Sequence, residues 1–165
     1  MFNKFINFFT HDEKQLKSDR YIFITILITA LIGLLASLVL SVEALTLAKN
    51  PEASLSCNIN ELINCATVAN SSFAQIFGFP NSFIGMMVEP VFAALAIAGL
   101  FGTKFTKQFM FLMQITAAIS LVFAFYLLFV SSFIISAFCP WCLLVDVSTI
   151  IMFFAVTRYN VLHDN

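Results

Sequence analysis

Four cysteines fall into two pairs in this chain. Cys139 and Cys142 are separated only by a proline and a tryptophan, in the stretch SAFCPWCLLVDV. Proline is favoured at the first position of a helix, because the N–H that it lacks would have no partner there. We therefore expect Cys139 to lie at the N-cap of a helix, with Cys142 about one turn further along.

A helix start changes the chemistry of a thiol. Unpaired backbone N–H groups and the positive end of the helix dipole stabilise a thiolate and lower the thiol pKa. Two thiols at the C-x-x-C spacing can also close into a small disulfide. The CPWC stretch thus indicates a redox-active dithiol, although zinc sites share this spacing.

The second pair, Cys57 and Cys65, lies in the stretch CNINELINC. If the whole interval were helical, the two Cα atoms would lie about 12 Å apart, beyond the limit of about 7 Å for a disulfide. Either Cys57 lies on a bent segment before the helix and pairs with Cys65, or each has another partner. A mobile pair would suit electron relay, in which Cys57 meets an external protein and Cys65 exchanges with CPWC through mixed disulfides.

The cysteines admit three interpretations. One is a redox relay, another is a non-catalytic membrane protein with structural disulfides in its outer loop, and the third is a zinc site. A structural bridge seldom begins an apolar helix with CPWC, and the histidines His11 and His163 lie in the terminal tails, too far away to add zinc ligands. We therefore favour the relay and predict no metal site. Two electrons that leave a dithiol at a membrane surface need an acceptor, for which a lipid-soluble quinone is suitable.

The composition predicts an integral membrane protein. Of 165 residues, 61% are hydrophobic and 10% are charged, whereas a soluble domain carries about 25% charged residues. The mean hydropathy is +0.97. The net charge of −1 gives no indication of a nucleic-acid partner, so we expect the lipid bilayer to be the main surrounding of the chain.

Four apolar runs can cross a bilayer, and they predict an all-α, four-helix membrane bundle. The first, residues 21–42, has 22 residues without a charge, about 33 Å as a helix against a hydrocarbon core of roughly 30 Å. It is longer than the apolar part of a signal peptide and lacks a convincing cleavage site, so we expect it to be retained. The other runs are residues 82–103, 109–135 and 139–157.

The basic residues predict the orientation of the four spans. With four spans, seven of the eight basic residues fall on one side of the membrane, and only Lys49 falls on the other. The positive-inside rule makes the first side cytoplasmic. We thus expect a multi-pass protein of the cell inner membrane with cytoplasmic tails, 1–20 and 158–165, and a periplasmic loop, 43–81, that places all the cysteines on the oxidising side. The seven residues are Lys4, Lys14, Lys17, Arg20, Lys104, Lys107 and Arg158.

The outer loop is more apolar than most loops. Ile59, Leu62, Ile63 and Ala66 recur at helical spacing, which predicts a short amphipathic helix that lies in the interface or caps the bundle. The alternative is a loop helix that packs for stability alone.

Three further residues in or beside the spans are candidates for function. Asp146 lies one turn beyond Cys142 and is the best candidate for proton handling, with a packing role as the alternative, because ionisable residues in spans are rare. Glu89 precedes Pro90, and a snorkelling or helix-paired carboxylate is an equally good interpretation of it. Trp141 is able to stack on a quinone, although tryptophan at an interface is commonly an anchor. Glu43 ends the first charge-free run, where we expect it to be solvated.

The order of three stretches is distinctive. CNINELINC, then FGFPNSFIG, then CPWC at the start of the last helix resembles the vitamin K epoxide reductase family, specifically its bacterial homologues, over about residues 21–157. The resemblance implies a four-helix bundle around a quinone, ubiquinone or menaquinone, close to the C-x-x-C. It also implies an oxidoreductase that acts on protein dithiols, with the quinone as electron acceptor.

The resemblance assigns a role to each cysteine. Cys142 corresponds to the cysteine that contacts and reduces the quinone, and Cys139 to its partner, which exchanges with Cys65. Cys57 corresponds to the outermost shuttle, which meets a periplasmic thioredoxin-like (DsbA-like) protein. The implied function is a quinone-dependent thiol–disulfide oxidoreductase that reoxidises this periplasmic disulfide donor.

Two further positions follow from the same resemblance. Asn81 corresponds to the asparagine that hydrogen-bonds a quinone carbonyl. Asp146 stands where the vertebrate enzymes have a tyrosine that donates a hydrogen bond to the quinone, and an ionised carboxylate cannot donate. A protonated carboxyl group is able to donate, and burial near a membrane favours the protonated form. The departure therefore weakens the case for epoxide reduction by this chain.

Overall fold

The computed structural model describes residues 2–163 except 54, 56, 59 and 61, with side chains described from residue 17 onward. The helices are α1 (Phe2–Lys49), α2 (Cys65–Ala69), α3 (Ser82–Leu100), α4 (Lys107–Val130) and α5 (Pro140–His163). A short 3₁₀ turn, η1 (Ser72–Gln75), and a π-helical turn, η2 (Ser131–Ile135), complete the order. No β-strand is present in the described part of the chain, which contains one isolated β-bridge.

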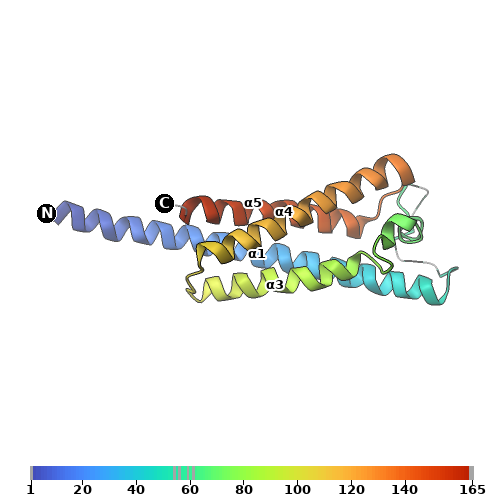
Figure 1. The fold of residues 1–165 in the computed structure, drawn as a ribbon, viewed down its shortest axis with the longest axis horizontal. Helices are drawn as coiled ribbons and strands as arrows, with labels where there is room; N and C mark the ends of the chain where they lie inside the picture. The colour runs from blue at the N-terminus through green and yellow to red at the C-terminus, as the bar shows by residue number, and fades with distance from the viewer. Residues whose placement is uncertain (1, 54, 56, 59, 61, 164–165) are drawn as a thin grey trace.

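Four helices are long and apolar enough to cross a membrane, so the predicted all-α membrane bundle is confirmed. The spans are Lys17–Lys49, Ser82–Leu100, Lys107–Ile135 and Pro140–His163. Helix α1 packs against both α3 and α5, and α4 packs against α5 (Figure 1). Both termini and the α3–α4 turn lie at one end of the bundle, and the segment between α1 and α3 folds over the other end.

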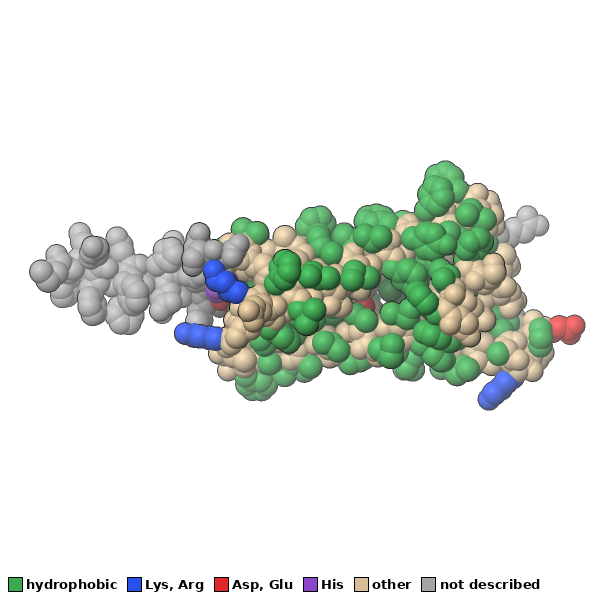
Figure 2. Space-filling view, viewed as in Figure 1, with side chains coloured by type: hydrophobic (Ala, Val, Ile, Leu, Met, Phe, Trp, Pro, Cys, Tyr) green, Lys and Arg blue, Asp and Glu red, His purple; other side chains and the backbone are tan. Residues whose placement is uncertain are grey.

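The core lies where α1, α3 and α5 meet. The fully buried side chains there include Ile26, Phe92 and Met152. Gly99 allows the close approach of α3 to α1, because a Cβ at this position would lie 2.5 Å from the ring of the buried Phe23. Large apolar side chains cover the outer surface along the length of the bundle (Figure 2), as expected of a surface that faces lipid.

Helix α5 begins at Pro140, which confirms that Cys139 immediately precedes a helix. The chain reaches this point through a sharp turn, since Ser136 adopts a left-handed conformation with φ of 56° after the π-helical turn. Ser131 Oγ donates a hydrogen bond of 2.7 Å to the carbonyl of Ala137 and so holds the turn against the end of α4. The sequence before CPWC thus fixes where the last helix starts.

The predicted loop helix is present as α2, but it begins at Cys65. Ile63 instead forms a parallel β-bridge with Phe138. The amide of Phe138 donates to the carbonyl of Leu62 at 2.8 Å, so Leu62 and Ile63 are not on the helix that their spacing predicted. Ile59, the first residue of that pattern, lies outside the described residues. A contact distant in sequence therefore overrides the local helical pattern and ties the loop to the segment before α5.

Basic side chains gather at the end of the bundle where both termini lie (Figure 2). Among side chains in the described ranges, five of them flank the spans at this end, whereas Lys49 ends α1 at the other end. At the first end, a hydrogen bond of 3.1 Å between His163 and Asp19 joins α5 to α1. The five are Lys17, Arg20, Lys104, Lys107 and Arg158.

Candidate functional site

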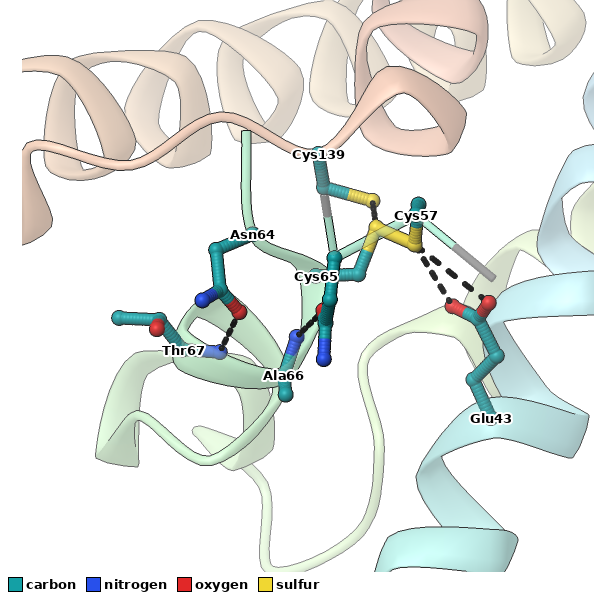
Figure 3. The surroundings of a disulfide bond; sticks show 8 residues. Glu43, Cys57, Asn64, Cys65, Ala66, Thr67 and Cys139 are labelled. Carbon is teal, nitrogen blue, oxygen red and sulfur yellow. Dashed lines mark hydrogen bonds between the residues drawn. A yellow bond between two sulfur atoms is a disulfide. The ribbon is translucent and has the colours of Figure 1, made fainter. Parts of the chain in front are cut away.

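Three sulfur atoms meet at the end of the bundle opposite the termini. Cys57 and Cys65 form a disulfide, with their Cα atoms 5.7 Å apart. Cys139 is a free cysteine, and its Sγ lies 3.2 Å from Cys65 Sγ (Figure 3). The Sγ atoms of all three lie within 4.8 Å of one another, and all three residues are buried. Cys65 is thus bonded to one cysteine and in contact with another.

The loop fixes the position of Cys65 through two asparagines. Asn64 is the N-cap of α2, and its Oδ1 accepts a hydrogen bond of 3.0 Å from the amide of Thr67. Asn58 Oδ1 accepts another, of 3.1 Å, from the amide of Ala66 (Figure 3). Cys57 lies on a bent segment before this helix and is bonded to Cys65. Of the two alternatives for the loop cysteines, the structure therefore has the one in which they pair with each other.

Cys139 is brought to Cys65 by the residue before it. The amide of Asn64 donates to the carbonyl of Phe138 at 3.1 Å, and the Ile63–Phe138 bridge continues this pairing. Backbone hydrogen bonds thus align the two cysteines that follow, Cys65 and Cys139, at adjacent positions on paired segments. The contact does not depend on side-chain packing alone.

The pKa of the Cys139 thiol is lowered, which is the direction that the helix start predicts, although the main cause is the neighbouring cysteine. A hydrogen bond from the Cys142 side chain is the largest influence, and it lowers the pKa of Cys139 below that of an ordinary thiol. Backbone N–H groups of Cys142 and Trp141 lower it further, while burial and the negative charge of Glu43 act in the opposite direction. Cys139 is therefore a good leaving group in disulfide exchange.

We expect the Cys142→Ala variant to have a higher Cys139 pKa than the wild type, because the strongest stabilisation of the thiolate is removed. At pH 7 a smaller fraction of Cys139 would then be ionised, and its reaction with methyl methanethiosulfonate would be several-fold slower, in proportion to the thiolate fraction. Mass spectrometry of the Cys139 peptide as a function of pH measures this shift. The Cys142→Ser variant keeps an O–H donor and is the matched control. We expect the pH midpoint of its Cys139 labelling to lie near that of the wild type. If the pH midpoint of Cys139 labelling is unchanged in the alanine variant, Cys142 does not lower the pKa of Cys139.

A cavity of about 300 Å³ lies next to the cysteines, inside the bundle. Cys65, Cys139 and Cys142 line it at one end, and side chains of α1, α3, α4 and α5 form its walls. The walls are mainly apolar, as in most sites for small organic ligands. The three-sulfur group and this cavity are therefore adjacent and share two residues, Cys65 and Cys139.

The predicted ligand-binding residues divide into two groups. Asn81, Cys142 and Asp146 line the cavity, whereas Trp141 is not among its lining residues and packs against the cluster that contains Cys57, Cys65 and Cys139. One Asn81 N–H donates 2.7 Å to the carbonyl of Phe73, and its Oδ1 accepts 3.3 Å from the Ile76 amide. An Asn side chain has a second N–H, which leaves one donor for a ligand.

Two carboxylic acids line the cavity. Asp146 and Glu89 are both buried, with 9% and 3% of their surfaces exposed. Glu89 Oε1 lies against Gly33, where a Cβ would be 2.6 Å away. Glu89 Oε2 has no hydrogen-bond partner among the described residues. The expected alternative of a snorkelling Glu89 does not match this burial, and the unpartnered oxygen is available to a ligand in the cavity.

Glu43 is the residue of this site that the sequence interpretation missed. We expected it to be solvated, but only 8% of its surface is exposed. Its Oε1 and Oε2 lie 3.5 and 3.7 Å from Cys57 Sγ (Figure 3). The sequence contained one indication that Glu43 is buried, because apolar residues continue on both sides of it. In the structure the helix accordingly runs on to Lys49.

This geometry suits thiol–disulfide exchange. Cys65 is bonded to Cys57, and its sulfur also contacts Cys139. The disulfide of Cys65 can therefore change its partner from Cys57 to Cys139 without a large movement. A zinc site needs thiolates, and with Cys57 and Cys65 bonded to each other only Cys139 of this cluster can supply one.

Comparison with known protein families gives one match. The model of the vitamin K epoxide reductase family matches residues 24–157. The matched segment contains all four cysteines, the loop and most of each of the four spans. No curated protein matches the chain.

Proposed function

Because the chain belongs to the vitamin K epoxide reductase family and is a thiol–disulfide oxidoreductase of the membrane, we propose that its electron acceptor is a quinone. The electron donor that we propose is a periplasmic thioredoxin-like protein. The observation that carries the proposal is the 3.2 Å contact between Cys65 and Cys139, at the end of an apolar cavity that Cys142 also lines.

Electrons enter through the loop pair. Cys57 is buried in the structure, so this step requires the loop to open when the donor binds. A thiolate of the donor then attacks Cys57, and the loop disulfide is reduced through a mixed disulfide. The Cys65 thiolate then attacks Cys139 in the Cys139–Cys142 disulfide, and Cys142 leaves as a thiolate. Finally, Cys57 attacks Cys65, which restores the loop disulfide and releases Cys139. The structure has the arrangement expected after this last step, with the loop pair bonded and the CPWC pair free.

The cavity fits a quinone in size and polarity. A bound quinone would accept two electrons and two protons from the reduced CPWC pair. Cys142 lines the cavity, so its sulfur would be able to reach the ring of a quinone bound there. The free N–H of Asn81 would donate to one carbonyl, and the carboxyl groups of Asp146 and Glu89 are polar groups further inside.

The orientation in the membrane follows from charge. The described basic side chains at the end with both termini favour a cytoplasmic location for that end, by the positive-inside rule. The sulfur cluster at the other end would then face the periplasm of a bacterium. Disulfides persist in that compartment, as the exchange requires.

Anaerobic mixing of the reduced protein with ubiquinone and menaquinone analogues tests the function. We expect one equivalent of quinol for each pair of thiols lost, with the loop disulfide formed by exchange with the Cys139–Cys142 pair, which the quinone then oxidises again. Quinone absorbance and free thiols are followed together. If the thiols and the quinone both remain unchanged, the alternative of a non-catalytic protein with structural disulfides is favoured.

We expect the Asp146→Asn variant to reduce quinone about 10- to 100-fold more slowly, at or below the low end of general acid catalysis, because an amide cannot deliver a proton. Its exchange between Cys65 and Cys139 should remain at the wild-type rate, since Asp146 lies about two helical turns beyond Cys139 in the sequence of α5. Stopped-flow absorbance measures the first rate and acid quench with thiol labelling the second. Equal quinone reduction at all pH values would remove Asp146 from the mechanism.

A further inference from the structure

We propose that Glu43 is a catalytic base, which takes the proton of the Cys57 thiol when this sulfur attacks the disulfide between Cys65 and Cys139. The inference rests on the exchange sequence of the proposed function and adds a residue to it. Neither the family match nor the cysteine pattern assigns a role to this glutamate.

The geometry gives Glu43 direct access to the reacting sulfur. Both of its carboxylate oxygens lie within 3.7 Å of Cys57 Sγ. The carboxylate approaches Cys57 from α1, on the side away from Cys139, so it does not block the exchange (Figure 3). In the state with the loop disulfide formed, the carboxylate is thus already beside the sulfur that makes the attack.

Burial makes such a base necessary. Only 6% of the Cys57 surface and 8% of the Glu43 surface are exposed, so bulk water has little access to the thiol proton. A free thiol has a pKa of about 8.5, which leaves only a few per cent as thiolate at neutral pH. A carboxylate that removes the proton during the attack raises the rate without a fully formed Cys57 thiolate.

The step balances in atoms and electrons. The Cys57 Sγ–Cys65 Sγ bond forms and the Cys65 Sγ–Cys139 Sγ bond breaks, with its electron pair leaving on Cys139. The proton of Cys57 passes to Glu43. The lowered pKa of Cys139 favours this direction, because negative charge moves from the glutamate to a sulfur that hydrogen bonds stabilise. In the reverse step the Glu43 carboxyl returns the proton to Cys57 as it leaves.

The described titratable groups that interact with Glu43 come from the loop and from the start of α5. Cys57 in the loop is in contact with the carboxylate. The Glu43 charge also acts on Cys139 and Cys142, whose sulfurs lie near the CPWC helix start. A change in the Glu43 charge is therefore expected to affect the pH profile of the exchange as well as its rate.

The test isolates the exchange from both the quinone and the donor protein. In the Cys142→Ala background, Cys139 attacks Cys65 and releases Cys57. A saturating maleimide labels Cys57 after this exchange or Cys139 before it, and the ratio of the two labelled products gives the exchange rate relative to the labelling rate of Cys139. The product, with Cys57 labelled and Cys65 bonded to Cys139, is counted by mass spectrometry. Failure of the proposed quinone chemistry leaves this assay unaffected, so the two proposals fail separately.

We expect Glu43→Gln in this background to slow the trapped exchange by about 100-fold, the low end for general acid–base catalysis. The ionisation of Glu43 should also disappear from the pH profile of the exchange rate in this variant. Glu43→Asp should keep an ionisation, but at a shifted pH, and should keep part of the rate. Glu52→Gln changes an exposed glutamate near the end of α1 and is the matched control, with the rate unchanged.

A wild-type rate and pH profile in the Glu43→Gln variant would overturn the proposal. If this variant does not fold, as shown by loss of the loop disulfide, the Glu43→Asp variant takes its place. A shifted ionisation in that variant supports the base, and a profile identical to the wild type refutes it.

Discussion

A variant with serine at positions 57 and 142 is expected to oxidise almost completely to one internal disulfide, between Cys65 and Cys139. Each remaining cysteine has lost its own partner, and their Sγ atoms lie 3.2 Å apart in the native arrangement. The backbone pairing of Asn64 with Phe138 holds both cysteines in place without the loop disulfide. Non-reducing peptide mass spectrometry after mild oxidation measures the yield.

The matched control leaves Cys57 and Cys142 in place and replaces Cys65 and Cys139 by serine. Cys142 is not part of the group of sulfurs that lie within 4.8 Å of one another, so this pair should form a disulfide far more slowly. Equal yields in the two variants would mean that the loop moves freely, and the exchange order proposed from the contact would then be wrong.

This expected result concerns the intermediate of the reaction. The same Cys65–Cys139 bond forms in either direction of electron flow, because Cys65 is the sulfur shared by both pairs. While it exists, Cys57 and Cys142 are both thiols, one beside Glu43 and the other in the cavity. In the proposed sequence, the two reactive thiols of the intermediate are therefore separate, and each has its own proposed acid–base residue, Glu43 for Cys57 and Asp146 for Cys142.

Hydropathy was sufficient to predict the bundle, because each span must satisfy its backbone hydrogen bonds within one helix. The predicted boundaries were less accurate for identifiable reasons. We ended the first span at Val42 because Glu43 is charged, but Glu43 is buried against Cys57 and the helix runs on to Lys49. Pro90, which interrupts the second apolar run, lies within α3 without ending it.

The exchange centre was only partly predictable from the sequence. The CPWC pattern correctly placed Cys139 before a helix, because proline has a strong local preference for that position. The register of Cys65 depends on the bridge between Ile63 and Phe138, two residues far apart in the chain, and no local pattern contains that information. The role we infer for Glu43 depends on the same folded loop.

Replacement of Cys65 by alanine is expected to lower quinone-linked turnover by more than about 10³-fold, a scale typical of the loss of a reacting nucleophile. Cys57 would keep its place but lose the sulfur through which electrons pass to Cys139. The Cys57 thiolate of this variant can still attack the disulfide of the oxidised thioredoxin-like protein, and one sulfur of that protein leaves as a thiolate. A mixed disulfide between Cys57 and the thioredoxin-like protein should therefore accumulate. Non-reducing electrophoresis of periplasm-exposed protein, with identification of the joined peptides, detects this adduct.

The control removes both cysteines of the loop, by combining Cys57→Ala with Cys65→Ala, and should give no adduct. The protein level separates a catalytic role from a structural one. A loop closed by residues only eight positions apart gains limited stability from its disulfide, because the loop-closure entropy grows with loop length. Loss of turnover at a normal protein level, together with the Cys57 adduct, thus indicates electron transfer. Normal levels without any adduct to a thioredoxin-like dithiol would instead mean that the loop pair is a structural bridge, even though Cys139 lies in contact with it.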